Sequence, residues 1–426
     1  MAILILTIFV VLLIGSLVRP LWALALAMLM FPIEQSLQGA VDAFRAFPPL
    51  ANYIVAAVVG IAAVRATLAM HRPFFGYFSR AWLLTLSIFA WSAVSLLWTP
   101  AMPQAGEMVR EGIPYFILFV VAAPILIDSV DDLTDLASLF MVFGTLVALT
   151  IIVNPEFNLK SGRLGVMLTS TVRSSPLAIG ELGGTLLIVS ALFRSSSSNK
   201  FLKVARSAAF ICGTTLALYS GSRGQLIFGA AFALVFFPVA KPVKSLGSYA
   251  IAVIGVVLVG GALVAISQLV LEGDMLRRWQ GDVLSQGVEV RQLNMLDLFR
   301  AFAANPVAWI FGLGWNAFSA LTDASREPYS HSIIVDVLTE LGIPAFIAFG
   351  YIMASVVQCG LNLFRAWSQN EARRVAITIF VALGLYQFLL VNKQGYLWGV
   401  GLSFLHWLII VRVWERSGPG GAAVNE

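Results

Sequence analysis

The chain has 426 residues, of which 59% are hydrophobic and 12% are charged, and its formal net charge is +5. Soluble proteins carry about 25% charged residues, so this composition excludes an ordinary soluble domain and predicts an all-α, polytopic membrane bundle. The apolar stretches are continuous and do not alternate with polar residues, which argues against a transmembrane barrel.

The predicted elements are apolar runs of the length that crosses a membrane, which is roughly 17–25 residues. In chain order they lie near 2–18, 21–32, 50–70, 81–98, 113–127, 133–153, 177–193, 205–220, 224–240, 248–271, 332–357, 374–392 and 396–414. The first two are short and separated only by Arg19 and Pro20, so twelve or thirteen spans are expected. The first run lacks a positively charged leader region and is followed at once by another run, which predicts a membrane segment and not a cleaved signal peptide.

Basic residues are distributed unevenly between the two alternate sets of loops. One set holds 15 Lys and Arg; the other holds 12, five of them in the long segment 272–330, which the positive-inside rule discounts. The first set is therefore predicted to face the cytoplasm, and segment 272–330 the periplasm. We expect one integrated domain with an N-terminal bundle over 1–271, a periplasmic loop with amphipathic helices over 272–330, and C-terminal helices over 331–426.

Several common reaction motifs are absent from the sequence. There is no GxxxxGK[ST] loop, no HExxH, no paired-cysteine metal spacing and no Asp-x-Asp pair. These absences argue against an ATP-driven pump and predict neither a metal nor another cofactor. The two cysteines, Cys212 and Cys359, fall in or beside apolar runs and are expected to be buried, inert thiols.

The short stretch YSGSRGQ, residues 219–225, lies between two apolar runs on the predicted outer side. Its Arg223 is either an interfacial anchor or an anion-binding residue, and Gly221 and Gly224 would let a phosphate approach the backbone. Ten of the 12 basic residues predicted on this side are arginine, whose planar group binds phosphate in a bidentate manner. The further candidates for phosphate or glycan contacts are Arg163, Arg173, Arg291 and Arg300.

His331 precedes an apolar run, with Ser330 as the expected helix N-cap. It is either a histidine at the membrane rim or a general base, which its ordinary pKa permits. Tyr329 is a neighbouring candidate for substrate contact.

Asp336 and Glu340 are four residues apart and share a helix face. There they either line a polar cavity or form a buried ion pair, with Lys393 or Arg223 as the partner.

In order, these motifs resemble the O-antigen ligase and polymerase superfamily. SGSRGQL resembles the family's Ser-Arg-Gly motif, and PYSHSIIVDVLTELGIPAF resembles its His-(Asn/Ser)…Glu-x-Gly-x-x-Gly block, except that Pro344-Ala345 stands where a glycine is common. VRQLNMLDLFRAFAANPVAWIFGLGWNAF resembles the stretch before that block. The resemblance covers most of residues 160–360.

The resemblance implies a metal-independent membrane glycosyltransferase with the C-type fold in the bacterial inner membrane. Its donor would be a glycan on undecaprenyl pyrophosphate, and its active site would face the periplasm. Carried over by motif, Arg223 and Arg163 contact the pyrophosphate, with Arg173 competing for the second place. His331 activates or orients the acceptor hydroxyl, and Arg291 is a weaker loop contact.

Several functions remain open at this point. A repeat-unit polymerase for O-antigen or exopolysaccharide, favoured by the Glu-Leu-Gly after the histidine, would use a lipid-linked glycan as acceptor, whereas a ligase would use lipid A core. A lipid-linked sugar flippase and a non-catalytic scaffold belong to other classes. The expected partners are these lipid-linked glycans, membrane lipids, a chain-length regulator and a flippase, and no nucleic acid.

Overall fold

The computed structural model describes residues 1–69, 78–157, 163–168, 174–194, 199–241, 281–321 and 330–417, with a few isolated positions between 245 and 261. Most of these residues are helical, and they contain no β-strand. The chain divides into two compact units, the first formed by 1–59, 130–284 and 367–386 and the second by 60–129, 285–366 and 387–426. The three-part division expected from the sequence stays a prediction.

Eight helices within the described ranges are long and apolar enough to cross a membrane, and a bent pair, α2 and α3, raises the number to nine if it counts as one span. The eight are α5 (Leu50–Ala69), α6 with its 3-10 extension (Arg80–Leu97), α7 with its extensions (Met102–Leu126), α8 (Val130–Val153), α10 (Lys200–Tyr219), α11 (Arg223–Ala240), α17 (Ile333–Trp367) and α18 (Glu371–Gln394). The chain is therefore a helical, multi-pass membrane protein. The predicted span 248–271 lies almost entirely outside the described residues.

The two N-terminal runs separate at Arg19, and the second run is itself bent at Leu29. α1 covers Ala2–Val18, and α2 (Pro20–Met28) meets α3 (Met30–Ala40) at a bend of 68°. α9 (Pro176–Leu192) is a further short apolar helix, and α19 (Gly401–Ser417) ends the described chain. The predicted 113–127 run starts too late, because the helix begins at Met102 with an amphipathic stretch that hydropathy alone does not detect.

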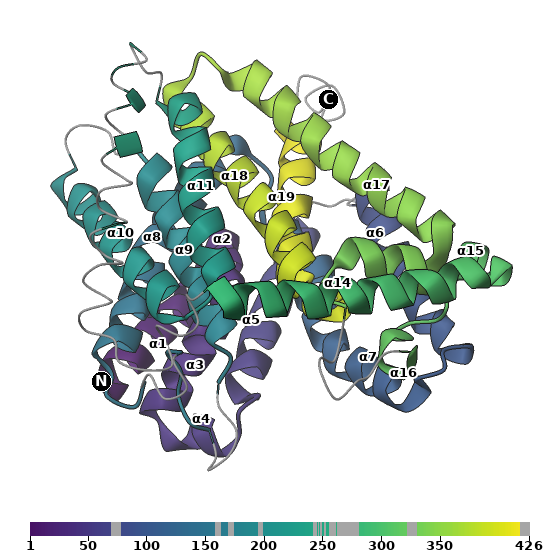
Figure 1. Ribbon diagram of the computed structural model, residues 1–426. Helices are drawn as coiled ribbons and strands as arrows, with labels where there is room; N and C mark the ends of the chain where they lie inside the picture. The colour runs from purple at the N-terminus through teal and green to yellow at the C-terminus, as the bar shows by residue number, and fades with distance from the viewer. Residues whose placement is uncertain are drawn as a thin grey trace. The chain divides into compact units, whose positions relative to one another are not determined.

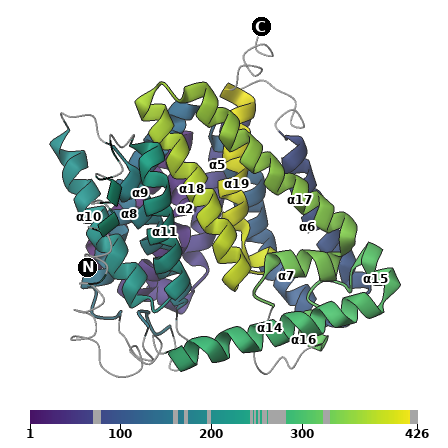
Figure 2. The same cartoon turned by 45° about the horizontal axis from the view of Figure 1, so that its top comes forward.

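The first unit is built around α8, α9, α10 and α11, which lie side by side in both views (Figures 1 and 2). Glycines let α9 approach its neighbours closely. A Cβ on Gly213 would lie 2.9 Å from the carbonyl oxygen of Gly183, and a Cβ on Gly229 would lie 3.1 Å from the Cα of Gly184. α10 and α11 therefore meet α9 backbone to backbone, as small residues allow in membrane bundles.

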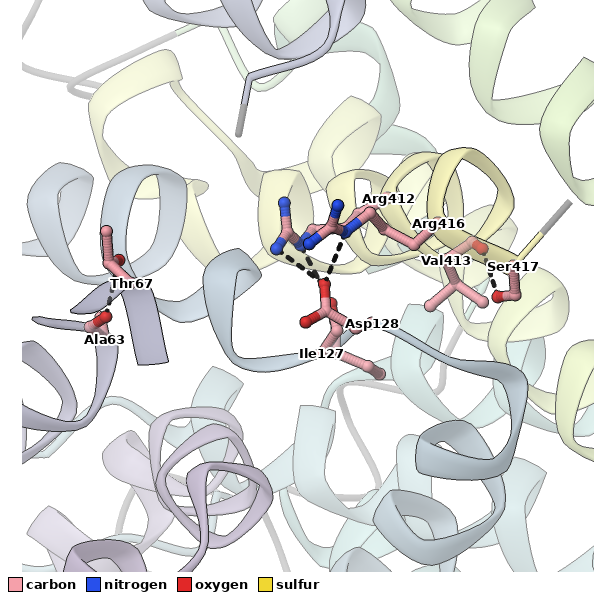
Figure 3. A network of polar contacts seen from close by, with 8 residues as sticks. All are labelled: Ala63, Thr67, Ile127, Asp128, Arg412, Val413, Arg416 and Ser417. Carbon is pink, nitrogen blue, oxygen red and sulfur yellow. Dashed lines mark hydrogen bonds and ion pairs between the residues drawn. The ribbon is translucent and has the colours of Figure 1, made fainter. Parts of the chain in front are cut away.

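The second unit has an aromatic core, in which Phe89 packs against Phe404 at a centroid distance of 5.2 Å and Phe404 against Trp407 at 4.9 Å. A partly buried cluster of two arginines and one carboxylate ties α19 to the turn before α8. Arg412 donates to Asp128 at 2.8 Å and Arg416 to the same oxygen at 3.0 Å. Figure 3 shows both guanidinium groups directed at this one carboxylate.

Candidate functional site

In the first unit, the YSGSRGQ stretch forms a tight turn that joins α10 to α11. Gly221 adopts a φ of 63°, in the left-handed region that favours glycine, so the turn requires a residue without a side chain there. Ser220 and Ser222 are buried, and the Ser220 hydroxyl accepts the N–H of Ser222 at 3.2 Å. The turn is thus a fixed structure, and Gly224 is buried within the first turn of α11.

Arg223 is the first residue of α11, and no side chain caps this helix end. Its side chain is half-buried. The first N–H groups of a helix carry partial positive charge, which favours anions at this place and opposes cations. A guanidinium placed here adds to that positive charge. Arg223 and the start of α11 are therefore together an electropositive position.

The segment that carries Arg163 is hydrogen-bonded to this turn. The backbone N–H of Leu164 donates to the carbonyl of Tyr219 at 2.8 Å. Two further hydrogen bonds join this segment to Ser174. The backbone N–H of Val166 donates to the Ser174 hydroxyl at 3.0 Å, and the backbone N–H of Ser174 donates to the Val166 carbonyl at 2.9 Å. Two arginines that are 60 residues apart in the sequence are thus held by directly bonded segments.

α9 packs closely against the turn between α10 and α11. A Cβ on Gly180 would lie 2.6 Å from the hydroxyl oxygen of Ser220, and a Cβ on Gly184 would lie 2.8 Å from the Gln225 carbonyl. The side chain of Gln35 on α3 donates to the carbonyl of Ser175 at 2.9 Å, just before α9 begins. The turn is therefore braced by α9, whose own start is fixed by α3.

In the second unit, His331 lies in the turn before α17. It is 5% exposed and has a φ of 67°, which is rare for a residue with a side chain. Such conformations cost of order 1–3 kcal/mol and persist where neighbouring contacts enforce them. Asn392 on α18 supplies such contacts: its side-chain oxygen accepts the Ser332 hydroxyl at 3.2 Å and the Ile334 N–H at 3.4 Å.

The expected N-cap assignment was wrong by two residues. α17 begins at Ile333, and Ser332 accepts the N–H of Val335 at 3.5 Å, whereas the Ser330 hydroxyl donates to the carboxylate of Asp336. Ser330 also accepts the N–H of Ser332 at 3.1 Å. The buried carboxylate of Asp336 therefore stabilises the turn that carries His331.

Glu340 has a different role from its neighbour. Its two carboxylate oxygens accept backbone N–H groups, Oε2 from Asn316 at 2.9 Å and Oε1 from Phe318 at 3.0 Å. The chain of α17 breaks two residues later at Gly342, with a φ of 88°. Glu340 therefore holds the 312–318 loop against the break in the helix, a role that neither alternative from the sequence anticipated.

Two further predicted arginines lie on one helix, α14 (Gly281–Ala304). Arg291 is half-buried, and Arg300 is exposed and pairs with Asp297 at 3.2 Å. Arg173 and Tyr329 lie outside the described residues. The structure thus joins the segments of Arg163 and Arg223 in the first unit. In the second unit it connects the turn of His331 to Asp336 through Ser330, whereas Glu340 binds a separate loop.

Sequence reasoning missed Asn392 and the 312–318 loop. Asn392 is the first residue of a short polar stretch, Asn-Lys-Gln, at the end of the apolar run of α18, and this change in polarity was its only sequence signal. Cys212 and Cys359 are buried, as expected. No protein-family model and no curated protein matches the chain significantly, so the family resemblance rests on the motif residues alone.

Proposed function

We propose that this protein is a membrane glycosyltransferase that moves a glycan from undecaprenyl pyrophosphate to a saccharide hydroxyl at the periplasmic face. The observation that carries the proposal is the hydrogen bond from Leu164 to Tyr219, which joins the Arg163 segment to the turn before Arg223. Two arginines on bonded segments, one of them at an uncapped helix start, are the donors that a pyrophosphate needs.

The anchor interpretation of Arg223 is less favourable on electrostatic grounds. A cation at a helix N-terminus costs several tenths of a kcal/mol, roughly 0.3–1, relative to a neutral residue. An anchor arginine that only contacts lipid headgroups would meet no such cost elsewhere on the surface. With a pyrophosphate bound, the unfavourable interaction energy would become favourable, because the start of α11 and the Arg223 guanidinium would both stabilise the same anion.

In the proposed reaction, negative charge develops on the pyrophosphate and a proton leaves the acceptor hydroxyl. The acceptor hydroxyl oxygen attacks the anomeric carbon, the bond from that carbon to the pyrophosphate oxygen breaks, and the hydroxyl proton passes to a general base, the role that the family resemblance gives to His331. Negative charge grows on the leaving pyrophosphate, and preorganised arginines in a partly dry site stabilise it strongly. Asp336 and Ser330 keep the His331 turn in its strained conformation.

The preferred member of this class is the repeat-unit polymerase, whose acceptor is a second lipid-linked glycan. The test uses purified protein in nanodiscs, undecaprenyl-pyrophosphate oligosaccharide and one acceptor at a time, with and without chelator. Extended lipid-linked product supports the polymerase, and glycosylated lipid A core assigns a ligase. Translocation of the donor without any glycan transfer would overturn both and indicate a flippase.

The residue assignments are tested in the same assay. Arg223→Ala and His331→Ala are expected to lower the rate by at least about 100-fold, as the loss of a transition-state donor or base does. Arg110→Ala is the matched control, because Arg110 is exposed and pairs only loosely with Glu107 at 3.6 Å. Equal rates for Arg223→Ala and the control would reject the pyrophosphate role.

A further inference from the structure

One side of α3 is polar although the helix is packed inside the first unit. Glu34, Gln35 and Gln38 lie within about 100° of one another around the helix axis and so form one face. Gln35 and Gln38 are only 5% and 2% exposed, and Glu34 is half-buried. Polar side chains inside a membrane protein are costly and mark functional positions. These three residues are the polar face of α3.

The polar face lies beside the segment that carries Arg163. The side chain of Gln35 donates to the carbonyl of Ser175 at 2.9 Å, and the residue before Ser175 is hydrogen-bonded to Val166. One turn further along α3, a Cβ on Gly39 would lie 3.1 Å from Cγ2 of Val166. Val166 follows Arg163 by three residues. The polar face is therefore a neighbour of the candidate pyrophosphate site, within the same unit.

Gln35 has a hydrogen-bond acceptor that the fold does not use. Its amide nitrogen is the group that donates to the Ser175 carbonyl, so its amide oxygen is the group left over. That oxygen is buried and has no hydrogen-bond partner in the part of the chain that the structure describes. Fixing the start of α9 requires only the amide donor. A buried acceptor without a partner is unfavourable, and a hydroxyl donated by a ligand would satisfy it.

Glu34 supplies a second acceptor, and its partners are neutral. The side chain of Gln38 donates to one of its oxygens at 3.0 Å, and the side chain of Asn52 on α5 also hydrogen-bonds to the carboxyl group. The nearest loop cation, Arg45, pairs instead with Glu156 at 3.5 Å. A half-buried carboxylate held only by amides attracts neutral hydroxyl donors and repels a phosphate.

Two exposed aromatic rings border the polar face. Phe47 and Tyr53 are 50% and 53% exposed, and their ring centroids are 6.0 Å apart. Hydrogen bonds tie both to the face, because Gln38 also donates to the carbonyl of Pro48 at 3.3 Å and Asn52 directly precedes Tyr53. A sugar ring has both properties that this surface matches: C–H groups that pack on an aromatic ring, and hydroxyls that need polar partners.

We propose that the polar face of α3, together with Asn52, Phe47 and Tyr53, binds the first sugar of the donor, a neutral ring that carries hydroxyl groups. This site rests on the proposed function, because a pyrophosphate held by Arg163 and Arg223 brings the sugar attached to it towards α3. The two sites divide the donor by charge. The arginines bind the phosphates, and the acidic and amide groups of α3 bind the uncharged sugar.

The test measures the affinity of the full-length protein in nanodiscs for two ligands, a short-chain polyprenyl pyrophosphate and the same lipid carrying one neutral hexose. The wild type is expected to bind the hexose form at least about fivefold more tightly, as one added hydrogen bond predicts. Gln35→Met removes the acceptor oxygen with little change in volume and is expected to abolish most of this preference, while the lipid without sugar binds as to the wild type. Tyr53→Leu, at an exposed position that does not endanger folding, is expected to lower the preference about threefold.

Ser36→Ala is the matched control. Ser36 is buried on the same helix but faces away from Glu34 and Gln38, where its hydroxyl accepts a hydrogen bond from Thr150 on α8 at 3.2 Å. This variant is expected to leave the preference for the hexose form intact.

Equal affinity of the wild type for the two ligands would overturn the sugar site and leave the pyrophosphate role of the arginines standing. Equal weakening of both ligands by Gln35→Met would also overturn the site, since Gln35 would then act only by fixing the start of α9. Failure of the wild type to bind either ligand would overturn the proposed function and the sugar site with it.

Discussion

Glu340 and Asn316 are joined by a hydrogen bond of 2.9 Å, in which the buried carboxylate accepts a backbone N–H from a loop 24 residues earlier. The same loop donates the N–H of Gly314 to the Glu340 carbonyl at 3.0 Å. One residue thus fixes the loop through both its side chain and its backbone. The break of α17 at Gly342 gives the loop room to approach, since a Cβ there would lie 2.5 Å from the Ile310 carbonyl.

Glu340→Gln is expected to destabilise the second unit by about 1–3 kcal/mol, because an amide has one acceptor oxygen and would point its NH2 group at the other backbone donor. Thermal unfolding in detergent measures the change. Glu107→Gln is the control, since Glu107 is 62% exposed and its replacement should change stability by less than about 0.5 kcal/mol. Equal melting temperatures for the two variants would contradict the role of Glu340.

Gly314→Ala is expected to cost about 1–3 kcal/mol, because Gly314 has a φ of 97° and a Cβ would lie 2.5 Å from the Cα of Thr99. Gly350 on α17 provides the contrast, because a Cβ there meets nothing within 4 Å. Gly350→Ala should be neutral or stabilising by up to about 1 kcal/mol. Thermal melts of both variants decide the matter, and a stable Gly314→Ala protein would rule out the tight contact.

Asp128→Asn is expected to destabilise the second unit by about 1.5–3 kcal/mol, the range for hydrogen bonds to charged groups. The reason is that Arg412 has a side chain only 4% exposed and would lose the carboxylate to which it donates a hydrogen bond (Figure 3). Asp297→Asn removes a pair that is 50% and 69% exposed and should cost under about 1 kcal/mol. Urea or thermal unfolding that shows the reverse order would refute the ranking.

The helices could be predicted because a membrane span is marked by the hydropathy of its own consecutive residues, without reference to distant parts of the chain. The runs at 133–153 and 224–240 lie within α8 and α11 with small differences in their bounds. α7 was placed too late because Met102–Phe116 buries one face only, so its polar residues lowered the average hydropathy of the window. The positive φ of Gly221 shows that the turn itself requires glycine there, whereas the sequence suggested only that a glycine would let a phosphate approach the backbone.

The contacts of the candidate site could not be predicted in the same way. The hydrogen bond from Leu164 to Tyr219 joins backbone groups, and backbone groups have no sequence signature. The hydrogen bond from Ser332 to Asn392 spans 60 residues and depends on how α17 and α18 pack. Glu340 shows the general difficulty: a buried acid predicts a partner, but the sequence does not say that the partner is backbone.

The contact between Leu164 and Tyr219 leads to a prediction about the backbone. Leu164→Pro removes the N–H donor and is expected to weaken binding of a short-chain polyprenyl pyrophosphate about fivefold, which corresponds to the loss of one hydrogen bond that positions Arg163. Leu164→Ala keeps the N–H and should bind nearly as well as the wild type. Titration of the purified variants, with melting temperatures measured in parallel, separates the two. Equal weakening in both variants would show that the leucine side chain, and not the hydrogen bond, positions the segment.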